Sequence, residues 1–155
     1  MADFYFVDTS ALAKRYIVEI GSVWLRNLLD PATENKVVVA RTTAVEMMAA
    51  ISRRERGATL APADAATARA SVRADLAHEY QVVELTATLA AHAMQLAERH
   101  SLRGYDAIQL AAALATNAVR TAQGLPPITM LSSDAELNAA AVAEGLTVDN
   151  PNAHP

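Results

Sequence analysis

Five short apolar segments alternate with longer helical segments along this chain, and no other feature constrains the fold as strongly. The short segments are residues 4–7, 36–40, 81–85, 128–131 and 146–148. Continuous runs of β-branched and large apolar residues are typical of strands buried on both faces. Strands that alternate with helices form parallel sheets with helices on both sides. The sequence therefore predicts a doubly wound α/β fold with a central, mainly parallel sheet of four to five short strands.

The intervening segments show helical spacing of apolar residues, with glycine or proline at their boundaries. They predict helices over residues 10–17, 23–29, 44–56, 62–79, 86–100, 105–120 and 133–145. No linker and no internal repeat interrupts the 155 residues, so we expect one domain over residues 1–155. Residues 149–155 are expected to form a polar C-terminal tail, since they carry no packing signal.

The composition excludes several classes of site. The chain has no cysteine, which excludes disulfides, thiolate zinc sites, iron–sulfur clusters and cysteine nucleophiles. Its four histidines have no metal-ligand spacing. Any metal ion would therefore be held mainly by oxygen ligands.

The charge pattern indicates where the protein works. Asp3 stands where a secretory signal would carry basic residues, and no apolar run reaches the ~18 residues of a membrane span. We therefore expect a cytoplasmic protein without a membrane partner. The net charge of −4 repels polyanions, so nucleic-acid binding would need a local basic patch or metal ions.

Acidic residues follow the predicted strands. Asp8 ends the first strand, Glu46 lies one turn into the helix after the second, and Asp134 begins the helix after residues 128–131. The carboxyl ends of parallel strands share one edge, so these three acids are expected at one rim. Asp106 lies in the first turn of its own helix, among apolar residues.

Helix capping is the alternative role for these acids. Thr43 to Glu46 and Ser133 to Glu136 match the capping box, and acids in a first turn favour the helix dipole. Asp8 is harder to explain in this way, because burying a carboxylate is costly unless it is paired, and the nearest cation in sequence is Lys14.

Together the four acids indicate metal chemistry. Clustered carboxylates repel one another, which raises their pKa values unless a divalent cation neutralises them. Oxygen ligands favour Mg²⁺ or Mn²⁺. Such a site activates water and polarises phosphoryl oxygens, as phosphodiester hydrolysis requires.

The chain resembles the PIN-domain ribonucleases, especially the VapC toxins of type II toxin–antitoxin modules. The resemblance covers essentially the whole chain and lies in residues 7–12, Glu46, residues 105–107 and residues 131–138. It implies a PIN-like fold and a Mg²⁺-dependent (or Mn²⁺-dependent) endoribonuclease that acts on structured RNA such as tRNA or rRNA. It further implies neutralisation by a VapB-type antitoxin and assembly as a homodimer.

By position in this resemblance, Asp8 and Asp106 would be the principal metal ligands. Glu46 and Asp134 would complete the acidic pocket, directly or through water. Ser10 would hydrogen-bond within the site, or else cap the first helix. Lys14 and Arg41 lie nearest the predicted rim and are candidate phosphate contacts. Further candidates are Arg15, Arg53, Arg54, Arg56 and Arg103, although the cations of residues 53–56 also suit a helix C-terminus.

Other enzyme classes fit less well. A haloacid-dehalogenase-type phosphatase needs a second acid two residues after the first aspartate, where this chain has Ser10. A dinucleotide-binding enzyme needs a glycine-rich turn after the first strand, which is absent. The remaining alternative is a catalytically silent PIN-like module that binds RNA or protein, since a fold alone does not define an activity.

Overall fold

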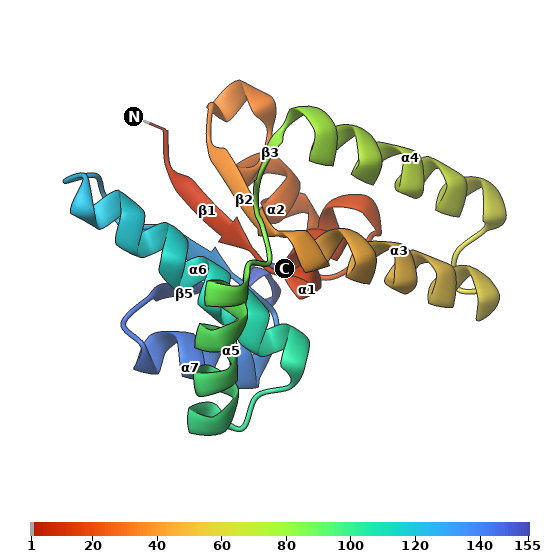
Figure 1. Ribbon diagram of the computed structural model, residues 1–155. Coiled ribbons are helices and arrows are strands. Elements are labelled where there is room, and N and C mark those ends of the chain that lie inside the picture. Colours follow the sequence, from red (N-terminus) through yellow and green to blue (C-terminus); the bar gives the residue numbers. More distant parts are fainter. Residues whose placement is uncertain (1) are drawn as a thin grey trace.

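The computed structural model describes residues 2–155 and contains a five-stranded parallel sheet (Figure 1). The strands are β1 (Phe4–Val7), β2 (Lys36–Ala40), β3 (Tyr80–Val83), β4 (Thr129–Leu131) and β5 (Thr147–Asp149). Their order in the sheet is β3-β2-β1-β4-β5, and every neighbouring pair is parallel. The predicted α/β class, the strand positions and the parallel pairing are confirmed.

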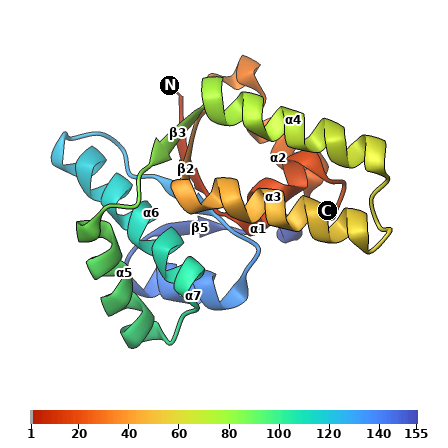
Figure 2. The same cartoon turned by 45° about the vertical axis from the view of Figure 1, so that its right-hand side comes forward.

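Helices cover both faces of this sheet (Figures 1 and 2). They are α1 (Thr9–Tyr16), α2 (Ser22–Leu28), α3 (Arg41–Arg56), α4 (Pro62–His78), α5 (Ala87–His100), α6 (Gly104–Ala122) and α7 (Ala135–Ala143). Two short 3₁₀ turns, η1 (Pro31–Thr33) and η2 (Pro151–Ala153), complete the chain.

Alternating side chains of each strand build two separate cores. Phe6 pairs in register with Val38 and Met130, and all three face the α5–α6–α7 layer. Val7 and Val39 point the other way, into the layer formed by α1 to α4. Successive strand residues point to opposite faces, so a strand covered on both sides must be apolar throughout. This explains why the strands appear in the sequence as continuous apolar runs.

The helix starts differ from the predicted caps. Asp8, not Ser10, caps α1, and its side chain accepts a hydrogen bond from the backbone N–H of Ser10. The capping box predicted at Thr43 is wrong, because α3 begins at Arg41 directly after β2. At α7 the cap is Asp134, whose Oδ1 accepts from the backbone N–H of Leu137 at 2.9 Å.

The C-terminal segment packs against the domain, contrary to the prediction for residues 149–155. Asp149 belongs to β5, and Pro151 is buried. The His154 ring stacks on Trp24, with centroids 4.0 Å apart and planes 6° apart. Gly21 has a φ of +84°, and a Cβ there would collide with the backbone of Pro151. The polar composition of residues 149–155 does not indicate this packing, because the packing depends on a few individual contacts of Asp149, Pro151 and His154.

Within residues 2–155, no helix is both long enough and apolar enough to cross a membrane.

Candidate active site

The strand order places a crevice at the carboxyl ends of β1 and β4. From β1 the sheet extends through β2 and β3 on one side and through β4 and β5 on the other. Ligand sites of open α/β sheets lie at such a reversal of strand order. A pocket of about 390 Å³ opens there, and its lining includes Asp8, Glu46, Asp106 and Asp134. The structure therefore brings all four predicted acids to one pocket, from four different parts of the chain.

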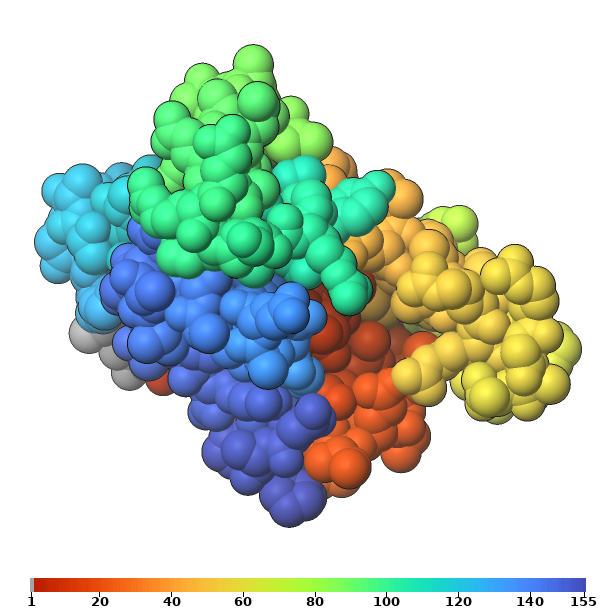
Figure 3. Space-filling view, turned by 90° about the horizontal axis from the view of Figure 1, so that it is seen from below, coloured from red at the N-terminus to blue at the C-terminus, as the bar shows by residue number. Residues whose placement is uncertain are grey.

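The pocket is visible on the surface of the molecule. In Figure 3 the red N-terminal segment lies recessed between the blue C-terminal segment, the teal start of α6 and the orange and yellow α3. These are the elements that carry the four acids: Asp8 before α1, Glu46 on α3, Asp106 on α6 and Asp134 before α7.

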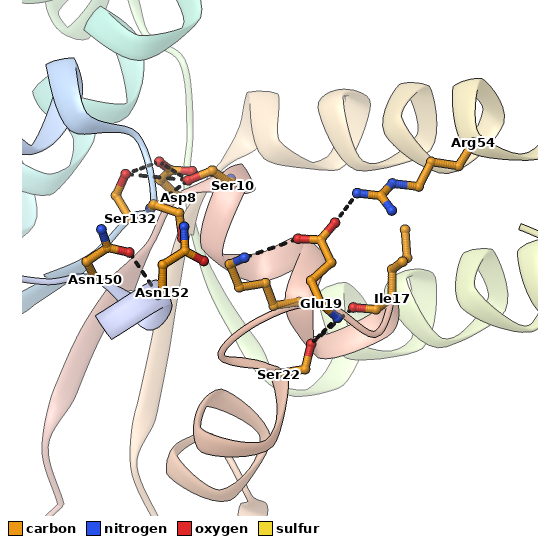
Figure 4. Close-up of polar contacts among 11 residues, drawn as sticks. Asp8, Ser10, Ile17, Glu19, Ser22, Arg54, Ser132, Asn150 and Asn152 are labelled. Atoms are coloured by element: carbon orange, nitrogen blue, oxygen red, sulfur yellow. Dashed lines mark hydrogen bonds and ion pairs between the residues drawn. The ribbon is translucent and has the colours of Figure 1, made fainter. Parts of the chain in front are cut away.

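Asp8 is the most deeply buried of the four, with 3% of its surface exposed. Its Oδ2 accepts hydrogen bonds from the hydroxyls of Ser132 at 2.6 Å and Ser10 at 3.0 Å (Figure 4). Burial raises the pKa of Asp8 from 3.8 to about 6, although these hydrogen bonds oppose the shift. No cation in residues 2–155 pairs with this carboxylate; Lys14 bonds elsewhere.

Two serines tie the start of α1 to the loop after β4. The Ser10 hydroxyl accepts from the backbone N–H of Ser133 at 2.9 Å, and Ser132 Oγ accepts from that of Asp134 at 3.1 Å. Ser10 therefore hydrogen-bonds within the site and does not cap the helix. Sequence reasoning missed Ser132, a fully buried residue directly after β4, because no local pattern shows that it lies beside Asp8.

Glu46 is held by a second polar cluster. Its Oε1 accepts from Thr9 Oγ1 at 3.0 Å and from Gln109 Nε2 at 3.1 Å. The same amide nitrogen donates to Thr43 Oγ1 at 2.8 Å. Gln109 is 2% exposed and was also missed, although a glutamine within the apolar run of residues 107–113 is itself unusual. These bonds fix the orientation of the Glu46 carboxylate.

Asp106 experiences the negative charge of its neighbours. Its pKa is raised first by partial burial and then by the charges of Asp134 and Glu46, while Arg103 opposes the shift. Asp134 uses Oδ1 as the α7 cap, and its Oδ2 bonds to nothing within the described chain. The repulsion expected from clustered carboxylates is therefore present in the structure.

Basic side chains, here called the basic wall, form another part of the pocket lining. Lys14, Arg53 and Arg54 line it together with the acids. Glu19 bridges two of these cations, because its Oε2 lies 3.1 Å from Lys14 Nζ and its Oε1 pairs with Arg54 (Figure 4).

The other predicted rim cation lies elsewhere. Arg41 does not line the pocket and is paired with Glu84 on the surface, so its position gives no support to the expected phosphate contact.

The donor set of the pocket fits a hard divalent cation. It includes carboxylate oxygens without sulfur or imidazole, and within residues 2–155 neither Asp8 nor Asp106 forms an ion pair. Among residues 2–155, no three acidic or histidine side chains stand close enough to enclose an ion by themselves. Mg²⁺ commonly binds through one or two carboxylates and keeps several waters, so the residues present suit it.

Comparison with known proteins identifies the family. The sequence matches the PIN domain family over residues 5–143, and the chain belongs to that family. It is 33% identical over 143 residues to Ribonuclease VapC45 of Mycobacterium tuberculosis (strain CDC 1551 / Oshkosh), which covers 92% of each chain. The resemblance to PIN-domain ribonucleases of the VapC type is thus confirmed.

Solved structures share the fold. The crystal structure of VapC20 from Mycobacterium tuberculosis, a sarcin–ricin loop cleaving toxin, has a TM-score of 0.63 at 22% identity and covers 97% of this chain and 99% of that one. VapBC2 from Rickettsia felis, bound to a DNA fragment from its promoter, has a TM-score of 0.60 at 13% identity, covering 95% and 98%. The predicted PIN-like architecture is therefore confirmed.

Proposed function

We propose that this protein is a Mg²⁺-dependent endoribonuclease of the VapC type, which hydrolyses phosphodiester bonds of structured RNA such as tRNA or rRNA. One observation carries the proposal: four carboxylates from distant parts of the chain line one pocket together with three basic side chains. The ribonuclease named among its relatives and the fold shared with a sarcin–ricin loop cleaving toxin support it. Mn²⁺ would serve in the same site, since it also prefers oxygen ligands.

Asp8 and Asp106 would hold the metal ion, with Glu46 and Asp134 completing the site directly or through water. The bound ion would supply a Lewis acid for the phosphate and a lowered pKa for its water. Ser10 and Ser132 orient the Asp8 carboxylate.

Glu46 would act as the general base for the attacking water. Thr9 and Gln109 occupy its Oε1, whereas no donor within residues 2–155 bonds to Oε2. Oε2 is therefore available to accept a proton from a water, which is the role of a general base in hydrolysis. The fixed Oε1 keeps that second oxygen in one orientation.

The basic wall would receive the RNA backbone. Lys14 and Arg54 face the pocket while Glu19 holds both, and Arg53 lies beside them on the last turn of α3. A phosphate between this wall and the carboxylates would meet positive charge on its free side. The ion pair with Glu19 also explains how the pocket keeps a buried Lys14 in place.

We further propose a VapB-type antitoxin as the partner and a homodimer as the assembly. Similar folds were solved in antitoxin modules, including VapBC2 from Rickettsia felis and FitAB bound to a DNA fragment. The antitoxin would neutralise the nuclease.

Cleavage of purified tRNA and rRNA by antitoxin-free protein tests the nuclease. We expect cutting with Mg²⁺ or Mn²⁺, none with EDTA, and none from Asp106→Asn. Asp64→Asn, the same chemical change on exposed α4, is the matched control and should cut normally. Cutting that survives both EDTA and Asp106→Asn would refute the proposed site. RNA binding without any cutting would favour the silent PIN-like binding module.

A further inference from the structure

A second pocket lies at the other end of α6 from the acidic site. It measures about 500 Å³ and is lined mainly by apolar side chains of β1, β2, β3 and the C-terminal half of α6. Phe4 contributes from the first position of β1, whereas Asp8 follows the last. Arg120 also lines it and lies about 21 Å along the helix from Asp106. The two pockets are therefore separate.

Arg120 is a buried cation in this apolar pocket, with 9% of its surface exposed. Its guanidinium carbon lies 3.5 Å from the centroid of the Phe4 ring, and its Nε donates to the carbonyl of Pro126 at 3.0 Å. Within residues 2–155, no carboxylate lies within 4.0 Å of the guanidinium, and no residue accepts a hydrogen bond from Nη1 or Nη2. Two donor groups at the pocket are thus without a protein partner.

An uncompensated buried charge is costly, and the other buried cation of the protein is paired. The comparably buried Lys14 has the carboxylate of Glu19 at 3.1 Å. The aromatic face of Phe4 and one carbonyl replace part of the hydration of the guanidinium, and the two Nη atoms remain accessible to a ligand. An anion placed on the two Nη groups would supply the missing charge and acceptors, since the planar fork of arginine matches a carboxylate.

We propose that this pocket binds a small organic carboxylate, with the anionic group on Arg120 and an apolar body against side chains such as Val38 and Val83. The volume falls within the range of small-molecule sites, which are mostly apolar with a few polar groups that fix orientation. Gln81 and Gln123 also line the pocket and add polar groups to it. The proposal is independent of the ribonuclease function.

Titration followed by amide and methyl NMR tests it, with 3-phenylpropionate as the probe and 3-phenylpropanamide as its neutral isostere. The carboxylate should shift the resonances of pocket residues such as Val83 and Leu125 in a saturable way. The amide should bind at least about tenfold more weakly, because it loses the charge-assisted hydrogen bonds. Equal binding of acid and amide, or shifts confined to the basic end of α3, would overturn the proposal.

Two variants locate the site. Arg120→Met should abolish the carboxylate-specific shifts, while Arg73→Met, on exposed α4, should leave them intact. Ala115→Phe fills the pocket without removing Arg120, so it tests whether the carboxylate binds in the pocket even if the Arg120 variant does not fold. Retained binding in the folded filled variant would refute the proposal. Binding of an acidic peptide, but of no small carboxylate, would identify a protein-docking surface and also refute it.

Discussion

Asp8→Asn should stabilise the metal-free protein, although it removes a proposed metal ligand. The pKa of Asp8 is raised from 3.8 to about 6 by burial, so holding this group ionised in the folded state costs about 3 kcal/mol. Asparagine is neutral and similar in shape, and its amide can still meet the hydroxyls of Ser10 and Ser132. Allowing for weaker hydrogen bonds, we expect a gain of about 1–3 kcal/mol at pH 8.

The stability difference between the variant and the parent should depend on pH. A carboxyl group with a raised folded-state pKa contributes stability that is fully present below its unfolded value of 3.8 and is lost as pH rises through about 6. The variant and the parent should therefore have similar stability near pH 3.5, diverge as the pH rises from 3.8 to about 6, and differ by a constant amount above pH 6. Urea denaturation in EDTA at both pH values measures the difference, and Asp64→Asn serves as the exposed control.

Adding Mg²⁺ should reverse the ranking at pH 8. Binding to the native state stabilises the parent by mass action, whereas the variant lacks a ligand and should gain less. For a domain of this size, 2 kcal/mol corresponds to a Tm shift of about 4–8 °C. An Asp8→Asn protein that is less stable than the parent at pH 8 in EDTA would refute the argument, because burial of an unpaired charge would then not dominate.

Three further predictions concern the packing of the C-terminal segment and the orientation of Glu46. Gly21→Ala should destabilise the fold by more than about 2 kcal/mol in urea denaturation, because the added carbon meets the Pro151 backbone. The control Gly124→Ala, also at positive φ but in open space, should cost about 1 kcal/mol. Gln109→Leu should lower RNA cleavage at least about tenfold while the metal-free protein stays folded, because the Glu46 carboxylate loses a positioning donor; unchanged cleavage would contradict that role. His154→Ala should shift the emission of Trp24, the single tryptophan, to longer wavelength, as the stacked ring is lost; an unchanged spectrum would mean the stack does not form in solution.

Sequence reasoning was most successful where the signal is local. The apolar runs predicted all five strands, and the position of Asp8, Glu46 and Asp134 relative to those strands predicted their shared rim. Asp106 was harder, because it follows no strand; its polar character in an apolar helix and the family resemblance indicated it. Capping assignments failed by one to three residues: the predicted caps of α1 and α3 lie inside those helices, and that of α7 lies one residue before the actual cap.

The partners of the acids were beyond sequence reasoning. Ser132 lies far from Asp8 along the chain, and Gln109 far from Glu46, yet each pair is within hydrogen-bond distance. Lys14 was predicted as a phosphate contact; it does line the pocket, but its pairing with Glu19, five residues away, was not foreseen.

The sequence by itself determined the element types, the parallel sheet and the presence of an acidic rim, because periodicity and strand-end position depend on neighbouring residues. The tertiary structure alone decided which hydroxyl and amide hold each carboxylate, that the C-terminal residues pack on Trp24, and that Arg120 is buried without a counter-ion. These contacts join residues from distant segments, and only the order of strands in the sheet brings such segments together.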